Sequence, residues 1–239
     1  MDHRILLSFE LPDPTPVSAE LARDLSEMEL VALGHFGLPE QTPPEVGRDQ
    51  FGDDAERELA AAIRALTDRG VDVPTRIVFG RARDKTIDRI AVEEGCDVLF
   101  VPGETDPDGI DAVFVPLRGE ENIAGVVSFA AELALDCDAS VTVFHDVEES
   151  DRVPGEELLA DAVDRLTAAG VPRDRIETVL GEAADVGGDI VERASAFDAV
   201  VLGESEPSLR ERLVGARPAA ITLDTDRPAF VVGDPGRRD

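Results

Sequence analysis

The feature that most limits the fold of this chain is an internal repeat. Residues 66–80 read LTDRGVDVPTRIVFG, and residues 166–181 read LTAAGVPRDRIETVLG. Both stretches begin with Leu-Thr-x-x-Gly-Val, and a glycine closes the apolar run at the end of each. A repeat of this kind indicates that the chain is built from copies of one structural unit.

Two further pairs of segments extend the repeat. CDVLFVPGE at 96–104 parallels FDAVVLGES at 197–205, and each places an aspartate before an apolar run that ends in Gly-Glu. RILLSFE at 4–10 parallels AVFVPLR at 112–118. The repeat therefore covers most of the chain and predicts two copies of one unit.

Short continuous apolar runs predict buried strands, and the stretches of about 10–15 residues between them predict helices. The expected strands are 5–9, 30–36, 75–79 and 98–101 in the first copy, and 112–117, 141–145, 176–180, 199–202 and 229–232 in the second. The expected helices are 18–28, 53–69, 84–94, 120–135, 155–169, 184–196 and 207–224. Residues 37–50 are rich in Pro, Gly and Gln, which predicts a loop.

Several residues are expected to mark helix ends. Asp53 or Asp54, Asp84 and Ser205 can accept hydrogen bonds from the first backbone N–H groups of the helices that follow them. Gly70 is expected to end the helix before it, because glycine readily takes the left-handed backbone conformation found there.

Strands that alternate with helices predict parallel βαβ units with helices on both faces of each sheet. The expected fold class is α/β, with two tandem Rossmann-like domains in residues 1–106 and 110–234. Only ETDPDGID lies between Gly103 and the strand expected at 112–117. The first domain is therefore expected to be truncated, without the last helix and strand of the second.

The charge balance excludes several kinds of partner. Asp and Glu number 52 against 23 Lys and Arg, which gives a formal net charge of -29. Such a surface repels nucleic acid and anionic membranes, so neither is an expected partner. The acidic residues are spread along the chain and Lys85 is its only lysine, which is typical of proteins from high salt, where ions screen the self-repulsion.

Other common classes of protein find no support in the sequence. Cys96 and Cys137 form no CxxC pair, and the three histidines are scattered, so no metal site is predicted. There is no charged and apolar leader and no run of about 18 apolar residues, so the cytoplasm is the expected location. Gly-Glu-Ser-Glu-Pro at 203–207 lacks the second glycine of a hydrolase nucleophile elbow, and every histidine precedes it.

The order of these elements resembles the universal stress protein family, most closely in the second half. Gly203 follows the fourth strand of that half, Gly215 lies further on, and RPAFVV at 227–232 looks like the family's last strand. The family often has a histidine at the end of its second strand, where His35 and His145 are expected. The resemblance implies tandem universal stress domains, here with the composition of a halophilic archaeon.

The same resemblance implies a nucleotide site, whose candidates are Gly203, Ser205 and Gly215, with Arg118 and Gly119 able to receive an anion at the next helix N-terminus. Family members that bind ATP bring backbone N–H groups close to the phosphates through glycines. In the family, Gly-x-x-Gly follows the fourth strand, and Gly-Ser or Gly-Thr comes later. Here Glu206, followed by Pro207, stands at the second glycine position, and Ala216 stands at the Ser/Thr position. The sequence therefore predicts a degenerate site with no cofactor, although ATP stays open as an alternative.

Three functions compete at this point. The first is a non-catalytic, universal-stress-type protein that regulates an unknown protein partner during stress. The second is a sensor in which the second domain binds ATP or a related nucleotide. The third is an unidentified nucleotide-dependent α/β enzyme. The resemblance also implies that the two copies pack as an internal pseudo-dimer, and that the strand at 229–232 can pair between chains in a homodimer.

Overall fold

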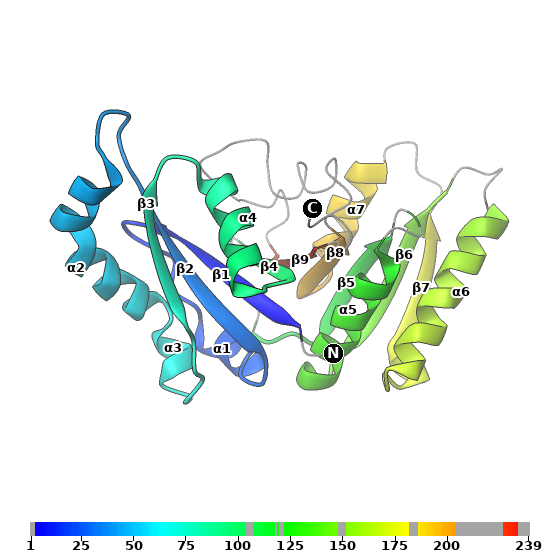
Figure 1. Ribbon diagram of the computed structural model, residues 1–239. Coiled ribbons are helices and arrows are strands. Elements are labelled where there is room, and N and C mark those ends of the chain that lie inside the picture. Colours follow the sequence, from blue (N-terminus) through cyan, green and yellow to red (C-terminus); the bar gives the residue numbers. More distant parts are fainter. Residues whose placement is uncertain are drawn as a thin grey trace. The chain divides into compact units, whose positions relative to one another are not determined.

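The computed structural model describes residues 3–103, 108–117, 119, 122–147, 152–181, 186–203 and 227–233. The chain divides after Phe100 into two compact units, Asp2–Phe100 and the part from Val101 onward. In each unit, parallel strands alternate along the chain with helices (Figure 1). This arrangement confirms the predicted α/β class, with parallel strands flanked by helices.

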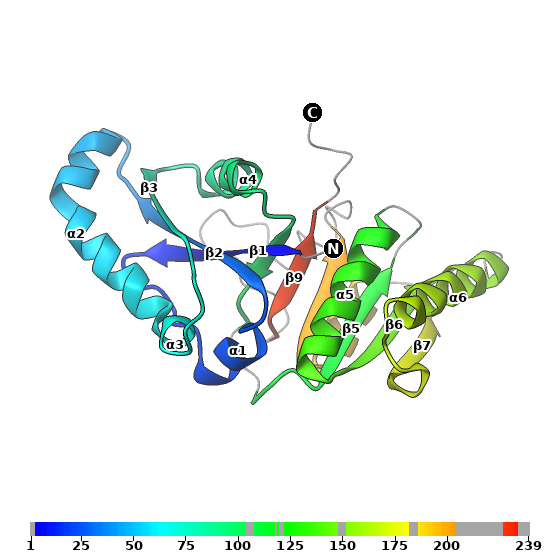
Figure 2. The ribbon, with the colours of Figure 1, turned by 60° about the horizontal axis from the view of Figure 1, so that its bottom comes forward.

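The first unit has four strands in the order β3-β2-β1-β4, and every pairing among them is parallel. Its elements are β1 (Arg4–Leu11), α1 (Ala19–Asp24), β2 (Glu29–Gly37), α2 (Pro44–Ala62), α3 (Arg64–Thr67), β3 (Thr75–Gly80), α4 (Arg83–Glu94) and β4 (Val98–Val101). The chain steps from β1 to β3 in one direction and then crosses back to β4. Right-handed crossovers therefore place α4 on the opposite face of the strands from α1 to α3, as Figure 2 shows.

The second unit has five strands in the order β9-β8-β5-β6-β7, again with parallel pairings. Its elements are β5 (Ala112–Leu117), α5 (Ile123–Cys137), β6 (Ser140–Asp146), α6 (Arg152–Ala168), a short 3-10 helix (Arg173–Arg175), β7 (Ile176–Gly181), α7 (Val186–Ala194), β8 (Ala199–Gly203) and β9 (Ala229–Val232). The helix expected at 207–224 lies outside the described residues. Here too the connection through α7 reverses direction, so α7 covers the face opposite to α5 and α6.

Each unit has its own aromatic cluster beside the buried strands. In the first, Phe36 on β2 stacks on Phe51 of α2, with ring centroids 5.1 Å apart, and lies 5.2 Å from Phe79. In the second, Phe114 on β5 stacks on Phe197 at 4.8 Å. Strand residues on both faces are buried, which is why their sequences are apolar without alternation.

Two helices begin differently from the prediction. The loop expected at 37–50 is wrong, because α2 already begins at Pro44 and Asp53 and Asp54 lie inside it. Proline is accepted in the first turn of a helix, where its missing N–H would have no partner in any case. The predicted cap at Asp84 is also wrong: this residue lies in the first turn of α4, and the N-cap is Ala82.

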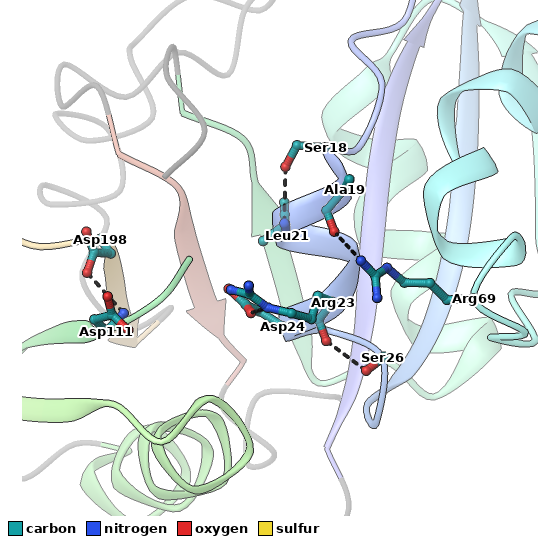
Figure 3. A network of polar contacts seen from close by, with 9 residues as sticks. All are labelled: Ser18, Ala19, Leu21, Arg23, Asp24, Ser26, Arg69, Asp111 and Asp198. Atoms are coloured by element: carbon teal, nitrogen blue, oxygen red, sulfur yellow. Dashed lines mark hydrogen bonds and ion pairs between the residues drawn. The ribbon is translucent and has the colours of Figure 1, made fainter. Parts of the chain in front are cut away.

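The expected helix 53–69 is interrupted at Ile63, after which α3 forms a separate turn. Gly70 follows with φ of 84°, as predicted for the residue after a helix. The helix expected at 18–28 ends early, at Asp24. Its start is as predicted, since the Ser18 hydroxyl accepts a hydrogen bond from the Leu21 backbone N–H at 3.1 Å (Figure 3).

The aspartates that precede the fourth strand of each unit have a structural role. In the first unit, Asp97 accepts the backbone N–H of Arg4 at 2.8 Å and pairs with His3 at 2.6 Å. In the second unit, Asp198 accepts the backbone N–H of Asp111 at 3.0 Å (Figure 3). It also accepts the backbone N–H of Ala112 at 2.9 Å. Each carboxylate thus links the starts of two neighbouring strands by hydrogen bonds, β1 and β4 in the first unit and β5 and β8 in the second.

The stability of the first unit is expected to fall in acid through Asp97. Burial alone would raise the pKa of Asp97, but its hydrogen bonds with His3 and the Arg4 backbone outweigh burial and lower the pKa. A carboxyl group with a lowered pKa stabilises the fold above its unfolded value of about 3.9, and this contribution is lost as pH falls through the folded pKa. The free energy of unfolding should therefore decrease below about pH 4.

Urea unfolding at a series of pH values tests this expectation in the wild type and in Asp97→Asn. The variant should be less stable at neutral pH and should lose less stability on acidification than the wild type. Asp72→Asn, at an exposed site in the same unit, serves as the control and should follow the wild type. Equal acid sensitivity of Asp97→Asn and the wild type would contradict the role assigned to Asp97.

Candidate functional site

The second unit reverses its direction of winding between β5 and β8. From β5 the chain continues to β6 and β7 on one side, whereas β8 and β9 lie on the other. In open parallel sheets, ligands bind beyond the carboxyl ends of the strands at such a reversal. Gly203 is the last residue of β8, and Gly119 follows β5 by two residues. The structure thus brings these two predicted site residues to the same edge.

The remaining residues of the predicted site, Arg118, Ser205 and Gly215, lie outside the described residues. Gly203 is buried and lies opposite Val232 of β9 in the parallel register, and Gly119 is half-buried. Of the two glycines, Gly119 has no described atom within 4 Å of the place of a Cβ, so its backbone permits a close approach by a ligand.

One residue at this edge was missed by the sequence analysis. Asn122 precedes α5 with φ of 56°, and its side-chain amide donates hydrogen bonds of 3.1 Å to the carbonyl oxygens of Val232 and Gly233. Its side chain makes no capping hydrogen bond to α5. Asn122 therefore ties the N-terminus of α5 to the end of β9, at the position where the sequence suggested an anion. The signal was available, because an asparagine directly before a long apolar run often marks a helix start.

His145, near the end of β6, is half-buried and hydrogen-bonded. Its Nδ1 lies 2.7 Å from the carbonyl oxygen of Leu117. A carbonyl oxygen only accepts, so Nδ1 carries the proton and donates it. The contact joins the carboxyl ends of β5 and β6. Gly155 lets α6 come close here, since a Cβ at that residue would lie 3.1 Å from the His145 ring.

His35 does not occupy the position equivalent to His145, although both were expected at the end of a second strand. In the parallel register His35 lies opposite Glu10, whereas His145 lies opposite Leu117, the counterpart of Phe9. A shift of one residue along a strand turns a side chain to the other face of the sheet. His35 is accordingly buried on the α4 face. Its Nε2 has no hydrogen-bond partner among the residues that the structure describes.

Two hollows lie beside the outer strands of the part of the chain that the structure describes. One, of about 490 Å³, lies between α2 and β3 and is lined by Arg48 and Glu56 among others. The other, of about 390 Å³, lies between α6 and β7.

Within the described ranges no cluster of His, Cys, Asp or Glu has the geometry of a metal site. None of the described helices is long and apolar enough to cross a membrane.

No protein-family model matches the chain, and no curated protein matches it by sequence. Solved structures do match. A universal stress protein from Archaeoglobus fulgidus DSM 4304 aligns over 97% of this chain and 98% of its own, with 11% identity and a TM-score of 0.63. A functionally unknown protein from Pseudomonas aeruginosa PAO1 aligns over 98% of this chain and 93% of its own, with 14% identity and a TM-score of 0.54. The chain therefore has the fold of these proteins over nearly its whole length.

Proposed function

We propose that the chain is a tandem universal-stress-type protein that acts without catalysis, by binding a protein partner during stress. The observation that carries the proposal is the combination of this fold with a broken nucleotide motif. The fold match extends over 97% of the chain. Glu206, which Pro207 follows, stands where the family pattern has its second glycine, and Ala216 stands where the pattern has a residue with a hydroxyl group.

The physical consequence of these changes is a poor environment for a triphosphate. Phosphates bind to backbone N–H groups that glycines expose and to hydroxyl groups that donate to them. Glu204 and Glu206 instead bring two carboxylates into the segment after β8. Like charges at close range oppose binding, and the net charge of -29 adds to this repulsion. The proposal therefore includes no cofactor.

The remaining parts of the proposal rest on the repeat, the charge balance and the family resemblance. The two domains comprise 1–106 and 110–234 and pack as an internal pseudo-dimer, and the strand at Ala229–Val232 can pair two chains in a homodimer. The protein acts in the cytoplasm of a halophilic archaeon. The partner is a protein that a strongly acidic surface can recognise, rather than nucleic acid or membrane.

The absence of catalysis is tested by measuring the release of inorganic phosphate from ATP with Mg²⁺ in concentrated KCl. The proposal predicts the same rate with and without the protein. Phosphate release that depends on the protein and disappears in Ser205→Ala would overturn it and favour an enzyme.

A nucleotide sensor is the second candidate, and the position of Gly119 and Gly203 at one edge favours it. The two candidates differ in what a restored motif should do. If the site is degenerate, the double substitution Glu206→Gly and Ala216→Ser should bind ATP more tightly than the wild type, because a carboxylate is removed and a hydroxyl is added. If the site is functional as it stands, the wild type should already bind and the restored variant should gain little.

Salt dependence tests the proposed halophilic character. Screening of the self-repulsion should raise the urea midpoint of unfolding as the KCl concentration increases from dilute buffer to several molar. The gain should be smaller in a variant in which five exposed glutamates or aspartates are replaced by glutamine or asparagine. A midpoint that does not rise with KCl would contradict this part of the proposal.

A further inference from the structure

The first unit holds a buried cation that the proposed function does not use. Arg83 is the first residue of α4, and its side chain is only 10% exposed. It lies at the carboxyl end of the strands, on the face where His35 and Glu10 also lie. Burial lowers the pKa of Arg83, while Glu10 and Asp84 act in the opposite direction. A guanidinium remains charged even so, because arginine does not lose its proton in proteins.

The hydrogen-bonding capacity of this guanidinium is poorly met. It carries five N–H donors, yet its Nη2 reaches only Ser8, at 3.4 Å from the hydroxyl and 3.5 Å from the carbonyl oxygen. Its Nη1 is 3.7 Å from the Glu10 carboxylate, which is an ion pair too long for a hydrogen bond. Its Nε is buried and has no acceptor in the part of the chain that the structure describes. Buried charged donors without acceptors are costly, so the site favours an additional acceptor.

His35 and the N-terminus of α4, both beside Arg83, also favour an additional acceptor at this site. His35 Nε2 is a second buried polar atom without a partner among the described residues. Burial and then the charge of Arg83 lower the pKa of His35, against the effects of Glu10 and Asp84. The N-terminus of the twelve-residue helix α4 also lies here, and its N-cap residue Ala82 provides no side-chain hydrogen bond to the first backbone N–H groups. The N-terminus of a helix attracts anions through these N–H groups and the helix dipole.

We propose that this cluster is a binding site for a phosphate group, either free phosphate or a phosphomonoester, whose oxygens take the place of Glu10 at Arg83. Glu10 can leave, since its side chain is 54% exposed and its ion pair with Arg83 is long. An arginine presents two parallel donors to phosphate. The Ser8 hydroxyl, 3.4 Å from Nη2 of Arg83, and the first backbone N–H groups of α4 are further donors beside it. A tetrahedral phosphate can accept from all of them, whereas a planar carboxylate can use fewer.

The site is independent of the glycine motif in the second unit. It can be tested by changing the charged residues around Arg83. Glu10 and Asp84 both oppose an incoming anion. Removing the Glu10 charge should therefore strengthen phosphate binding about tenfold or more, which is the scale of a hydrogen bond to a charged group. Removing the Arg83 charge should abolish binding. Arg89→Gln, an exposed position on the same helix, should leave binding unchanged.

The experiment is a ³¹P NMR titration of the full chain at constant ionic strength, with inorganic phosphate and with glycerol 3-phosphate as probes. The expected order of affinity is Glu10→Gln above wild type and Arg89→Gln, with no binding by Arg83→Gln. Tighter binding of glycerol 3-phosphate would assign an ester as the ligand, and tighter binding of inorganic phosphate would assign the free ion. Arg83→Lys keeps the charge and should retain weak binding, which separates loss of the site from loss of the fold.

Two results would overturn the proposal. One is an affinity in Glu10→Gln no higher than in the wild type. The other is equal binding by folded Arg83→Gln and Arg89→Gln, with folding checked by circular dichroism. Displacement of phosphate by equimolar acetate would also contradict the assignment, since it would show a preference for planar carboxylates.

Discussion

Replacing Phe114 by alanine is expected to destabilise the second unit by about 3–5 kcal/mol, the range for removal of a buried aromatic side chain. Phe114 is 1% exposed, and its ring lies 4.8 Å from Phe197 and 5.7 Å from Phe144. The substitution removes both ring contacts and leaves a cavity between β5 and the segment after α7. Because strands of a packed sheet relax little, the cavity should remain largely unfilled.

The measurement is native-state hydrogen exchange in increasing urea, which follows the amides of each unit separately. Protection of the amides in β5, β6 and β8 should decrease, while that of β1 and β2 should change little. Phe114→Leu should lose less than about 1.5 kcal/mol, because it keeps most of the buried volume. Val153→Ala, at a residue that is 63% exposed, is the control. A loss below about 1 kcal/mol for Phe114→Ala would contradict the packing described for this core.

Replacing Asp198 by alanine is expected to cost about 2–3 kcal/mol, because hydrogen bonds to a charged acceptor contribute about 1.5–3 kcal/mol. The Asp198 carboxylate accepts the backbone N–H groups of Asp111 and Ala112. Alanine would leave both donors without their acceptor at the start of β5. The start of β5 should then fray from β8, which also begins there.

Asparagine at the same position separates the hydrogen bonds from the charge. Asp198→Asn keeps an acceptor oxygen and should lose about half as much stability as the alanine variant, because neutral hydrogen bonds are weaker than charged ones. Asp161→Ala removes an exposed helical ion pair with Arg165 and should change stability by about 0.5 kcal/mol or less. Urea unfolding gives all three values. Equal stability of Asp198→Ala and the wild type would show that the aspartate does not fasten the strand.

The strands could be predicted from the sequence because they are apolar on both faces. The strands β4, β5 and β9 have the predicted bounds, and the others differ by one or two residues at an end. The start of α2 could not be predicted in the same way. Pro43, Pro44 and Gly47 suggest a loop by composition, yet proline fits the first turn of a helix. Gly47 brings that turn against Leu38, since a Cβ there would lie 2.7 Å from the Leu38 side chain.

The contacts at the candidate sites depend on residues far apart in the chain, which local patterns do not encode. Asn122 binds the end of β9 across 110 residues, and Arg83 reaches Ser8 across 75. The strand register could not be predicted either. His35 and His145 look equivalent in the sequence, but each strand pairs with the first strand of its own unit in a register that differs by one residue. The two side chains therefore point to opposite faces of their strands. The glycine site could be predicted from the sequence only because the order of the elements resembles that of a known family.

The most direct test of the proposed function is isothermal titration of the wild-type chain with ATP, with and without Mg²⁺, in KCl of several molar. The high salt ensures that the strongly acidic chain is folded during the measurement. The proposal predicts no binding up to millimolar ATP, and the search would then turn to protein partners. Micromolar binding would contradict it, because the site would then accept a triphosphate despite Glu206 and Ala216.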